Sequence, residues 1–451
     1  MTTNRSHGEM SDEHPNIASR RSFLWTVGST GAVLGVAGCI EDEEAPGVDD
    51  EDDDAVADED TEEPPEEAPD GELAVTGVWT GGEEEDFRAV MEHVEGELGV
   101  EIQYHPRDTE TLLTGTLMDY ESGVTPADIV VMPSPARVRA DGGRGHLEPV
   151  GDLWDPESYA PDPDPVMADG EVYAAPFKMD LKPGLWYRLS FFEEHGLSEP
   201  ESYDEFLNLL DEIQGIEGVD APLASGNGVG WPLSDVHEAF ILRQDGGPEL
   251  QQGLIAGEES FTDERVIAAF QEIQDTLMAG YWSELREFGV QYEYFWDNRL
   301  PLYFMGSWTP AFEAIEDPED VDFFRLPGTE GMVATVNWFT VPTYGPDVDG
   351  ARQAVEQFVS PEGQQVWVER GGFVPSSEEV PLEAYELDVM ANLVESAAEV
   401  TLVPDLDDSV GDPFQSEYWS QLTAFWTEPD RDIEGMAQSL DEVLQEAVEG
   451  E

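Results

Sequence analysis

Several tryptophans of this chain stand at turns or strand ends close to carboxylates, a pattern suited to holding a small molecule. Trp231 follows a glycine-rich segment and precedes a proline, and Asp235 comes four residues later. Trp308 follows the apolar run 302–305. Rings in such places can stack on an apolar ligand face, while a carboxylate accepts hydrogen bonds from hydroxyl groups. Packing is the alternative role, because a large protein buries many of its tryptophans, and Asp235 also suits a helix N-cap.

Signatures of catalysis and metal binding are missing from the sequence. Its seven histidines form no H-E-x-x-H pair, no G-x-S-x-G elbow occurs, and glycines 226, 228 and 230 lack the spacing and lysine of a P-loop. Glycosidase-type carboxylate pairs carry no diagnostic value among 102 acidic residues. We therefore predict a protein that is not an enzyme and has no cofactor or metal, with a secreted glycoside hydrolase as the enzyme alternative.

The charge of the chain is strongly negative. Its 451 residues include 102 Asp and Glu but 19 Lys and Arg, which gives a net charge of −83. Such a surface repels nucleic acids and anionic lipids, so nucleic acid is excluded as a partner. The excess is spread along the whole chain and resembles that of halophile proteins, whose charges are screened by molar salt. A metal-sequestering acidic protein is the alternative.

The N-terminal region resembles an export signal followed by an anchoring site. Residues 19–24 read S-R-R-S-F-L and resemble a twin-arginine signal, although Trp25 departs from its usual pattern. The apolar run 22–38 is too short and too weakly apolar for a stable transmembrane helix. It ends in V-A-G-C, which resembles a lipobox, and Cys39 is the only cysteine. We predict that residues 1–38 are a cleaved signal peptide and that Cys39 carries a lipid; a signal anchor with an incidental cysteine is the alternative.

The next segment, residues 39–71, is predicted to be a disordered acidic tether. Positions 41–70 contain 18 Asp or Glu, four Pro and no Lys or Arg. A block of like charges without aromatics cannot bury enough surface to fold. Calcium binding is the sharper alternative, but the segment has no EF-hand spacing.

Short strands and amphipathic helices alternate at the start of the folded region. The pattern predicts strands at 73–79, 100–104 and 128–132 and helices at 83–98 and 112–120. This order implies an α/β fold with a parallel sheet covered on both faces. Ligands of such sheets bind beyond the carboxyl ends of the strands, so we expect Trp79 and Glu83 at the rim of a cleft. Packing for Trp79 and helix capping for Glu83 are the alternatives.

From residue 73 onward the chain resembles extracellular sugar-binding proteins that serve ABC importers. The markers are T-P-A-D at 125–128, G-E-V-Y-A-A-P at 170–176, L-W-Y at 185–187, M-G-S-W at 305–308 and S-P-E-G at 360–363. Each marker is degenerate alone, but their shared order is specific. The run G-N-G-V-G-W-P at 226–232 is most similar to the α-glucoside-binding branch.

The resemblance implies a fold and a function. The fold would be a type II periplasmic-binding-protein-like α/β fold with two lobes, each a mainly parallel sheet flanked by helices. Lobe I would comprise 72–178 and 335–376, and lobe II 179–334 and 377–451, joined by several hinge crossings. The protein would capture a carbohydrate, such as an oligosaccharide or an α-glucoside, by closing its lobes, and would deliver it as a monomer to the transporter's permease subunits. A polyol or a peptide remains the alternative ligand.

The resemblance also extends the set of candidate ligand contacts. Trp231 and Trp308 match aromatic contacts of the family, Trp419 lies on a helix where the family often has a sugar-facing ring, and Trp338 lies near a predicted crossing. Asp180 and Lys182 fall at the first crossing, where a hinge hydrogen bond is the alternative role for Asp180. Lys182 and Lys178 are the only lysines of the chain, so a site that needs a compact ammonium is one explanation and chance is the other.

Overall fold

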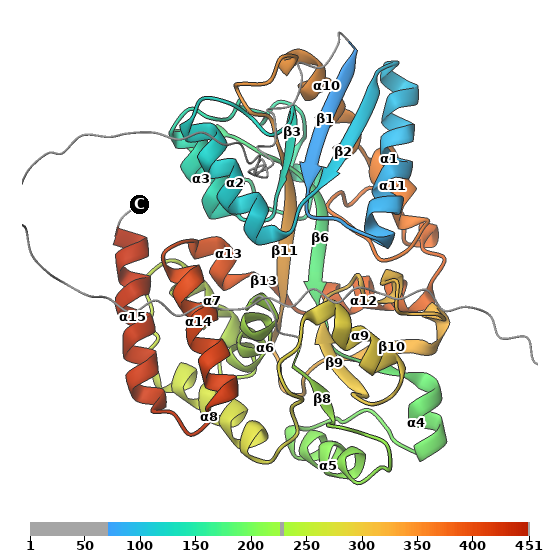
Figure 1. Ribbon diagram of the computed structural model, residues 1–451, viewed down its shortest axis with the longest axis vertical. Helices are drawn as coiled ribbons and strands as arrows, with labels where there is room; N and C mark the ends of the chain where they lie inside the picture. The colour runs from blue at the N-terminus through green and yellow to red at the C-terminus, as the bar shows by residue number, and fades with distance from the viewer. Residues whose placement is uncertain (1–70, 226–229, 450–451) are drawn as a thin grey trace, which may run out of the picture. The chain divides into compact units, whose positions relative to one another are not determined.

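The computed structural model describes residues 71–225 and 230–449, which form two α/β lobes linked by long strands (Figure 1). The predicted signal peptide, Cys39, nearly all of the predicted tether and residues 226–229 lie outside the described residues. Among the helices of the described part, none is long and apolar enough to cross a bilayer.

The first lobe begins with the strand and helix alternation that the sequence predicts. Strand β1 (Glu72–Gly77) pairs in parallel with β2 (Glu101–Pro106) and with β3 (Ile129–Met132). The intervening helices are α1 (Gly82–Leu98) and α2 (Thr109–Glu121). Helix α2 starts three residues earlier than predicted, because the Asp108 side chain accepts a hydrogen bond from the backbone N of Thr111 and caps the helix.

Two antiparallel strands, β6 (Ala175–Lys182) and β11 (Gly331–Thr340), run from one lobe toward the other (Figure 1). Asp180 lies opposite Thr335 and Lys182 opposite Val333, with a β-bulge between Asn337 and Trp338. The large sheet has the order β12-β6-β11-β3-β1-β2, in which β12 is Val374–Pro375, and β13 (Thr401–Pro404) pairs in parallel with β11. The central strands therefore bring segments far apart in sequence to one hinge.

A smaller sheet organises the second lobe. Its order is β10 (Val321–Phe324), β7 (Gly184–Arg188), β9 (Leu302–Met305) and β8 (Leu223–Ala224). Two of its three pairings are antiparallel, whereas a mainly parallel sheet was predicted. The difference has a topological reason: β7 continues from β6 as the chain enters the lobe, and β10 leads back toward β11 as the chain leaves it.

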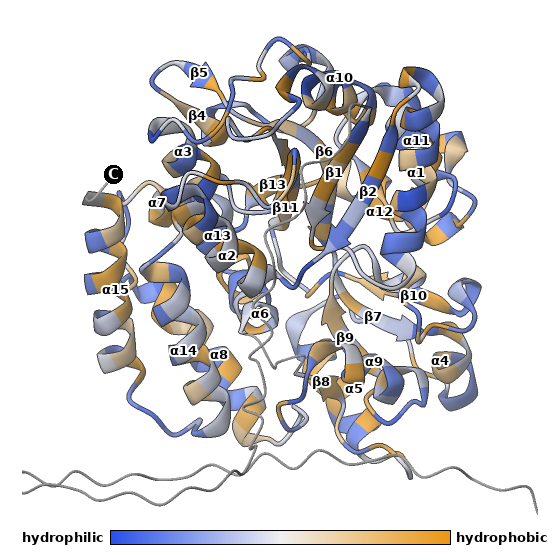
Figure 2. Ribbon diagram, turned by 45° about the horizontal axis from the view of Figure 1, so that its top comes forward, coloured by the Kyte–Doolittle hydropathy of each residue, from blue (hydrophilic) through white to orange (hydrophobic). Residues whose placement is uncertain are grey.

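Helices pack around both sheets and alternate hydrophobic with hydrophilic stretches, most visibly in α15 (Figure 2). The remaining elements are β4 (Met167–Ala168), β5 (Glu171–Val172), β12 (Val374–Pro375), α3 (Pro135–Gly143), α4 (Leu189–His195), α5 (Tyr203–Gln214), α6 (Trp231–Leu242), α7 (Gly247–Ile255), α8 (Glu264–Met278), α9 (Phe288–Trp296), α10 (Val348–Val359), α11 (Pro361–Val368), α12 (Asp388–Ala398), α13 (Leu406–Val410), α14 (Phe414–Thr427) and α15 (Ile433–Glu449).

The hydrophobic core is divided in a way that leaves the hinge between its parts. One cluster takes its buried residues from 73–177 and 338–373, and a second takes them from 185–326 and 406–444. A third cluster lies under the hinge and includes Met179 and Leu181 of β6 together with Met390 and Leu393 of α12. Because side chains alternate along a strand, the other face of β6 is available for polar residues.

Candidate functional site

The face of β6 opposite its apolar residues carries Lys178, Asp180 and Lys182. Lys178 Nζ lies 2.7 Å from Glu83 Oε1 and 2.5 Å from Asp180 Oδ1. The second carboxylate oxygen of Asp180 accepts a 2.5 Å hydrogen bond from Asn337 Nδ2 on β11. Glu83 belongs to the first turn of α1. This network therefore ties the start of a first-lobe helix to both hinge strands.

Lys178 is charged although it is only 1% exposed. Burial alone would lower the pKa of its ammonium, but the carboxylates of Asp180 and Glu83 outweigh burial and raise that pKa above its usual value. The Nζ atom also lies 5.7 Å from the centroid of the Trp308 ring and 5.5 Å from that of Trp367. A buried cation held by carboxylates and indole faces gives this end of the hinge a fixed, polar surface.

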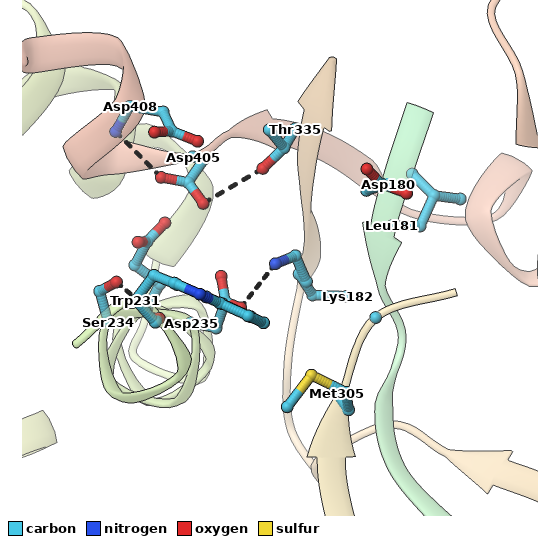
Figure 3. A network of polar contacts seen from close by, with 12 residues as sticks. Asp180, Leu181, Lys182, Trp231, Ser234, Asp235, Met305, Thr335, Asp405 and Asp408 are labelled. Carbon is cyan, nitrogen blue, oxygen red and sulfur yellow. Dashed lines mark hydrogen bonds and ion pairs between the residues drawn. The ribbon is translucent and has the colours of Figure 1, made fainter. Parts of the chain in front are cut away.

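Lys182 lies on the same face of β6, four residues after Lys178, and belongs to a second group of contacts. Its Nζ lies 2.6 Å from Asp235 Oδ2 and 4.9 Å from the ring centroids of both Trp231 and Trp308. Figure 3 shows Trp231 and Asp235 on α6 facing Lys182 on β6. The two indole centroids are 5.9 Å apart with their planes at 67°, and both rings are partly exposed. An ammonium, a carboxylate and two tryptophans thus converge from three separate segments.

The second group is also electrostatically coupled. Burial raises the pKa of the Asp235 carboxyl to about 7, although the Lys182 ammonium acts against this shift. Burial would lower the pKa of Lys182, but Asp235 and Asp405 raise it. Asp405 Oδ2 accepts a 3.2 Å hydrogen bond from Thr335 Oγ1, and Thr335 is the strand partner of Asp180. The two polar groups are therefore joined through the hinge strands.

The position of the Trp308 ring depends on its neighbour in the chain. Gly306 lies under the indole, and a Cβ added at Gly306 would overlap the ring atoms of Trp308. Trp308 precedes the short 3-10 turn Thr309–Ala311, whose Thr309 hydroxyl contacts Tyr292 at 2.8 Å. The local backbone thus places the ring against β9 and directs it at the lysines.

The two lobes also touch beside this region. Ser134 Oγ, at the N-cap of α3, donates a 3.1 Å hydrogen bond to the backbone oxygen of Asp408, and an Arg139 Nη2 donates at 3.3 Å to that of Ser409. A cavity of about 230 Å³ lies along this contact and is lined in part by Pro133, Pro135, Thr335, Trp338, Asp405 and Asp408. It is smaller than the roughly 300–1,000 Å³ of most ligand pockets.

Six of the predicted site residues come together around the hinge: Glu83, Asp180, Lys182, Trp231, Asp235 and Trp308. Trp419 approaches from α14, where its Nε1 donates a 2.9 Å hydrogen bond to Asp407 Oδ2. Its Cβ would lie 2.6 Å from a Cβ added at Gly230, so the ring is next to the start of α6.

The structure places two of the predicted site residues away from the lysine face of β6. Trp79 was expected at a cleft rim but is 1% exposed, with its ring centroid 4.7 Å from Phe87 and 5.0 Å from Trp367 in the first-lobe core. The Tyr104 hydroxyl accepts a hydrogen bond from the backbone N of Trp79 and donates one to its backbone O, and so fixes the backbone at this position. Trp338 is also a buried core residue; it follows the β-bulge and borders the small cavity rather than the lysine face.

The sequence prediction missed four residues of this arrangement. Asn337 and Thr335 alternate along β11 toward Asp180 and Asp405, a pattern that could be read only with the strand register known. Lys178 was noted as one of two lysines but was not selected as a site residue. For Asp405, which follows β13, the sequence offers no signal among so many carboxylates.

The chain is similar in sequence to known solute-binding proteins. A model of the family described as bacterial extracellular solute-binding protein matches residues 81–365. An uncharacterized ABC transporter extracellular-binding protein of Pyrococcus horikoshii is 38% identical over 376 residues, covering 82% of this chain and 87% of that protein. An alpha-glucosides-binding periplasmic protein of Rhizobium meliloti is 26% identical over 343 residues, covering 69% of this chain and 74% of its own length.

Solved structures show the same fold. A chitin oligosaccharide binding protein superposes with a TM-score of 0.73 at 20% identity, over 84% of this chain and 99% of its own. A maltotriose-binding protein of Thermus thermophilus, bound with maltotriose, gives a TM-score of 0.66 at 16% identity over 83% and 100%. The predicted two-lobed fold is confirmed by these likenesses.

Proposed function

Because the chain belongs to the family of bacterial extracellular solute-binding proteins, the solute-binding components of ABC transporters, we propose that its solute is a carbohydrate. The observation that supports this most strongly is the Trp231–Trp308 pair beside Lys182 and Asp235. Indole rings stack on the C–H faces of sugars, while a neighbouring ammonium and carboxylate bind hydroxyl groups. The alpha-glucoside-binding relative favours an α-glucoside or an oligosaccharide as the ligand.

The charges around the tryptophans favour a neutral ligand over an anion. Lys178 already pairs with Glu83 and Asp180, and Lys182 already pairs with Asp235. An anionic ligand would have to compete with these carboxylates inside a molecule of net charge −83. A polyhydroxylated neutral ligand can instead donate to the carboxylates and accept from the ammonium groups without displacing either.

Closure of the lobes around the ligand is the proposed working motion. The polar groups lie where β6 and β11 connect the lobes, and Glu83 and Asp235 reach this hinge from opposite lobes. A ligand held between these residues would stabilise the closed arrangement, which the permease subunits would then recognise.

A melting-temperature screen of the purified protein in molar salt tests the ligand class. The panel contains α-glucosides, β-linked oligosaccharides, polyols and short peptides, and each hit is checked for hydrolysis by product analysis. We expect at least one sugar to raise the melting temperature without being consumed. A shift produced by polyols or peptides but by no sugar would overturn the carbohydrate proposal, and release of hydrolysis products would favour the glycoside hydrolase.

The N-terminal region, which lies outside the described residues, supports a second proposal: export through a twin-arginine signal and attachment of the protein to the membrane by a lipid on Cys39. Substitution Cys39→Ser should then leave a precursor whose leader is not cleaved at the normal site. Mass spectrometry of the expressed protein and partition into detergent measure this outcome. Processing and partition identical to the wild type would exclude Cys39 as the lipidated residue.

A further inference from the structure

A group of buried carboxyl groups lies next to the Lys182–Asp235 pair, where α6 meets α13. Glu238, Asp405 and Asp407 are 0%, 6% and 2% exposed. One carboxylate oxygen of each lies within 4.8 Å of the others. The acidic excess of the whole chain is explained by a solvated surface, but solvation cannot explain carboxylates placed inside the protein. Both oxygens of Asp405 already accept hydrogen bonds, from Thr335 Oγ1 and from the backbone N of Asp408, but Glu238 and Asp407 require a further partner.

Hydrogen-bond donors hold one oxygen of Glu238 and leave the other free. Gln251 Nε2 donates to Glu238 Oε2 at 2.6 Å, and the backbone N of Leu406 donates to the same atom at 3.0 Å. Glu238 Oε1 is buried and has no hydrogen-bond partner among the described residues. Two donors on one oxygen fix the orientation of the carboxylate, as outer-shell donors do for metal ligands.

Asp407 repeats this arrangement from the other side. Trp419 Nε1 donates to Asp407 Oδ2 at 2.9 Å, and Gln415 Nε2 donates to the same oxygen at 3.1 Å. Asp407 Oδ1 is buried and, within the described part of the chain, has no hydrogen-bond partner. Two carboxylates on different helices thus each present one held oxygen and one free oxygen.

The side chain of Gln251 provides an observation that is independent of the acidic residues. It is fully buried, its amide lies against Glu238, and its Oε1 also lacks a hydrogen-bond partner in the described segments. A buried acceptor left without a partner destabilises the folded state. The unpartnered acceptors of Glu238, Asp407 and Gln251, whose amide nitrogen contacts Glu238, indicate a missing species that accepts electron pairs from oxygen.

A cation fits the free oxygens better than protonation does. The carboxylates of Glu238 and Asp407 are both buried, and an ionised carboxylate inside a protein needs a positive partner or donors for both of its oxygens. Protonation would have to neutralise each carboxyl separately, whereas one divalent cation can reach an oxygen of all three carboxyl groups, since these oxygens lie within 4.8 Å of one another. The nearby ammonium of Lys182 is already paired with Asp235.

We propose that Glu238, Asp405 and Asp407 bind one hard divalent cation, of the calcium or magnesium class, with Gln251 as an additional oxygen ligand. An all-oxygen donor set selects such cations over zinc or copper. The ion would fasten α6, which carries Trp231 and Asp235, to the segment that follows β13. The proposal does not depend on the nature of the solute.

Melting of the full chain after chelator treatment, in constant molar NaCl, tests this site with Ca²⁺ alone and Mg²⁺ alone. We expect a saturable rise of several degrees with at least one cation, because an ion that binds the folded state stabilises it. Glu238→Gln should lose the rise, whereas Glu395→Gln, an exposed acidic residue of α12, should keep it. No rise with either cation, or an equal rise in Glu238→Gln, would overturn the proposal.

Terbium luminescence provides a readout if Glu238→Gln fails to fold. Trp419 bonds Asp407, so its excitation should sensitise Tb³⁺ bound at this site. We expect emission that Ca²⁺ displaces, and loss of most of this emission in Trp419→Phe. Emission that neither Ca²⁺ nor Trp419→Phe reduces would indicate binding to the acidic surface only and would contradict the assignment.

Discussion

Lys182 occupies a place for which a compact cation is suited. Its Nζ contacts Asp235 and lies at the same distance, 4.9 Å, from two indole rings. The planar fork of an arginine is larger and would have to displace one of these rings or the carboxylate. The sequence singles out this residue by the scarcity of lysine, and its burial between two tryptophans gives a physical reason for the choice.

Substitution Lys182→Arg is therefore expected to weaken binding of the cognate ligand about tenfold, or roughly 1.4 kcal/mol. The control is Arg299→Lys, since Arg299 pairs with Asp220 on the surface and such pairs contribute little. Calorimetric titration measures both variants. Wild-type affinity together with wild-type melting temperature in Lys182→Arg would show that the shape of this cation does not matter.

At this scale the sequence predicted which residue types belong to the site better than where each side chain points. Asp235 and Trp231 were found because they lie on a turn and the first helical residues after it. The pairing of Asp235 with Lys182 joins residues 53 positions apart and could not be read from local spacing. Trp79 was misplaced because a strand end fixes the backbone but not the rotamer, and its ring packs against Phe87 and Trp367 in the core.

Among the elements, the end of β9 decides where the Trp308 ring lies. Gly306 has no side chain, and the indole occupies the space where a Cβ would stand. The substitution Gly306→Ala would therefore shift the ring without removing it. It separates the effect of the ring's position from the effect of having a tryptophan at all.

Gly306→Ala should reduce ligand affinity nearly as much as removal of the Trp308 ring. Gly96→Ala is the matched control: Gly96 lies in helix α1, nothing is within 4 Å of an added Cβ, and alanine favours the helix. Ligand titrations and melting curves are compared for both variants. Unchanged affinity in Gly306→Ala would mean that the ring does not need this position to bind ligand.

The sequence predicted the first elements well and the hinge less completely. The regular alternation of β1, α1, β2, α2 and β3 has clear periodicity, so errors were confined to the ends, as at the Asp108 cap of α2. The sequence indicated a lobe crossing near Trp338 but not the extent of strand β11, because its first half pairs with β6 and β13 in contacts that depend on distant segments. The sequence contains no periodic pattern that predicts the short helix α13 or the group of buried carboxylates beside it.

The whole molecule carries a net charge of −83, and this charge should make its stability depend on salt. At about 0.1 M salt the Debye length is about 10 Å, and repulsion between carboxylates opposes the compact state; at 1 M it is about 3 Å. We expect the melting temperature to climb steeply from dilute buffer to molar KCl or NaCl. A melting temperature that is the same from dilute buffer to molar salt would contradict the halophile interpretation.

The proposal that the tryptophan pair forms the sugar-binding surface is tested most directly by calorimetric affinity of Trp308→Ala in molar salt. The control is Trp296→Ala, whose ring stacks with Arg188 in the second lobe, 4.0 Å from its guanidinium. Loss of a stacking face should cost about 2 kcal/mol, some thirty-fold in affinity, with the melting temperature of the unliganded protein little changed. The opposite pattern in Trp308→Ala, a large fall in melting temperature with affinity intact, would show that the ring is packing and would contradict the proposed site.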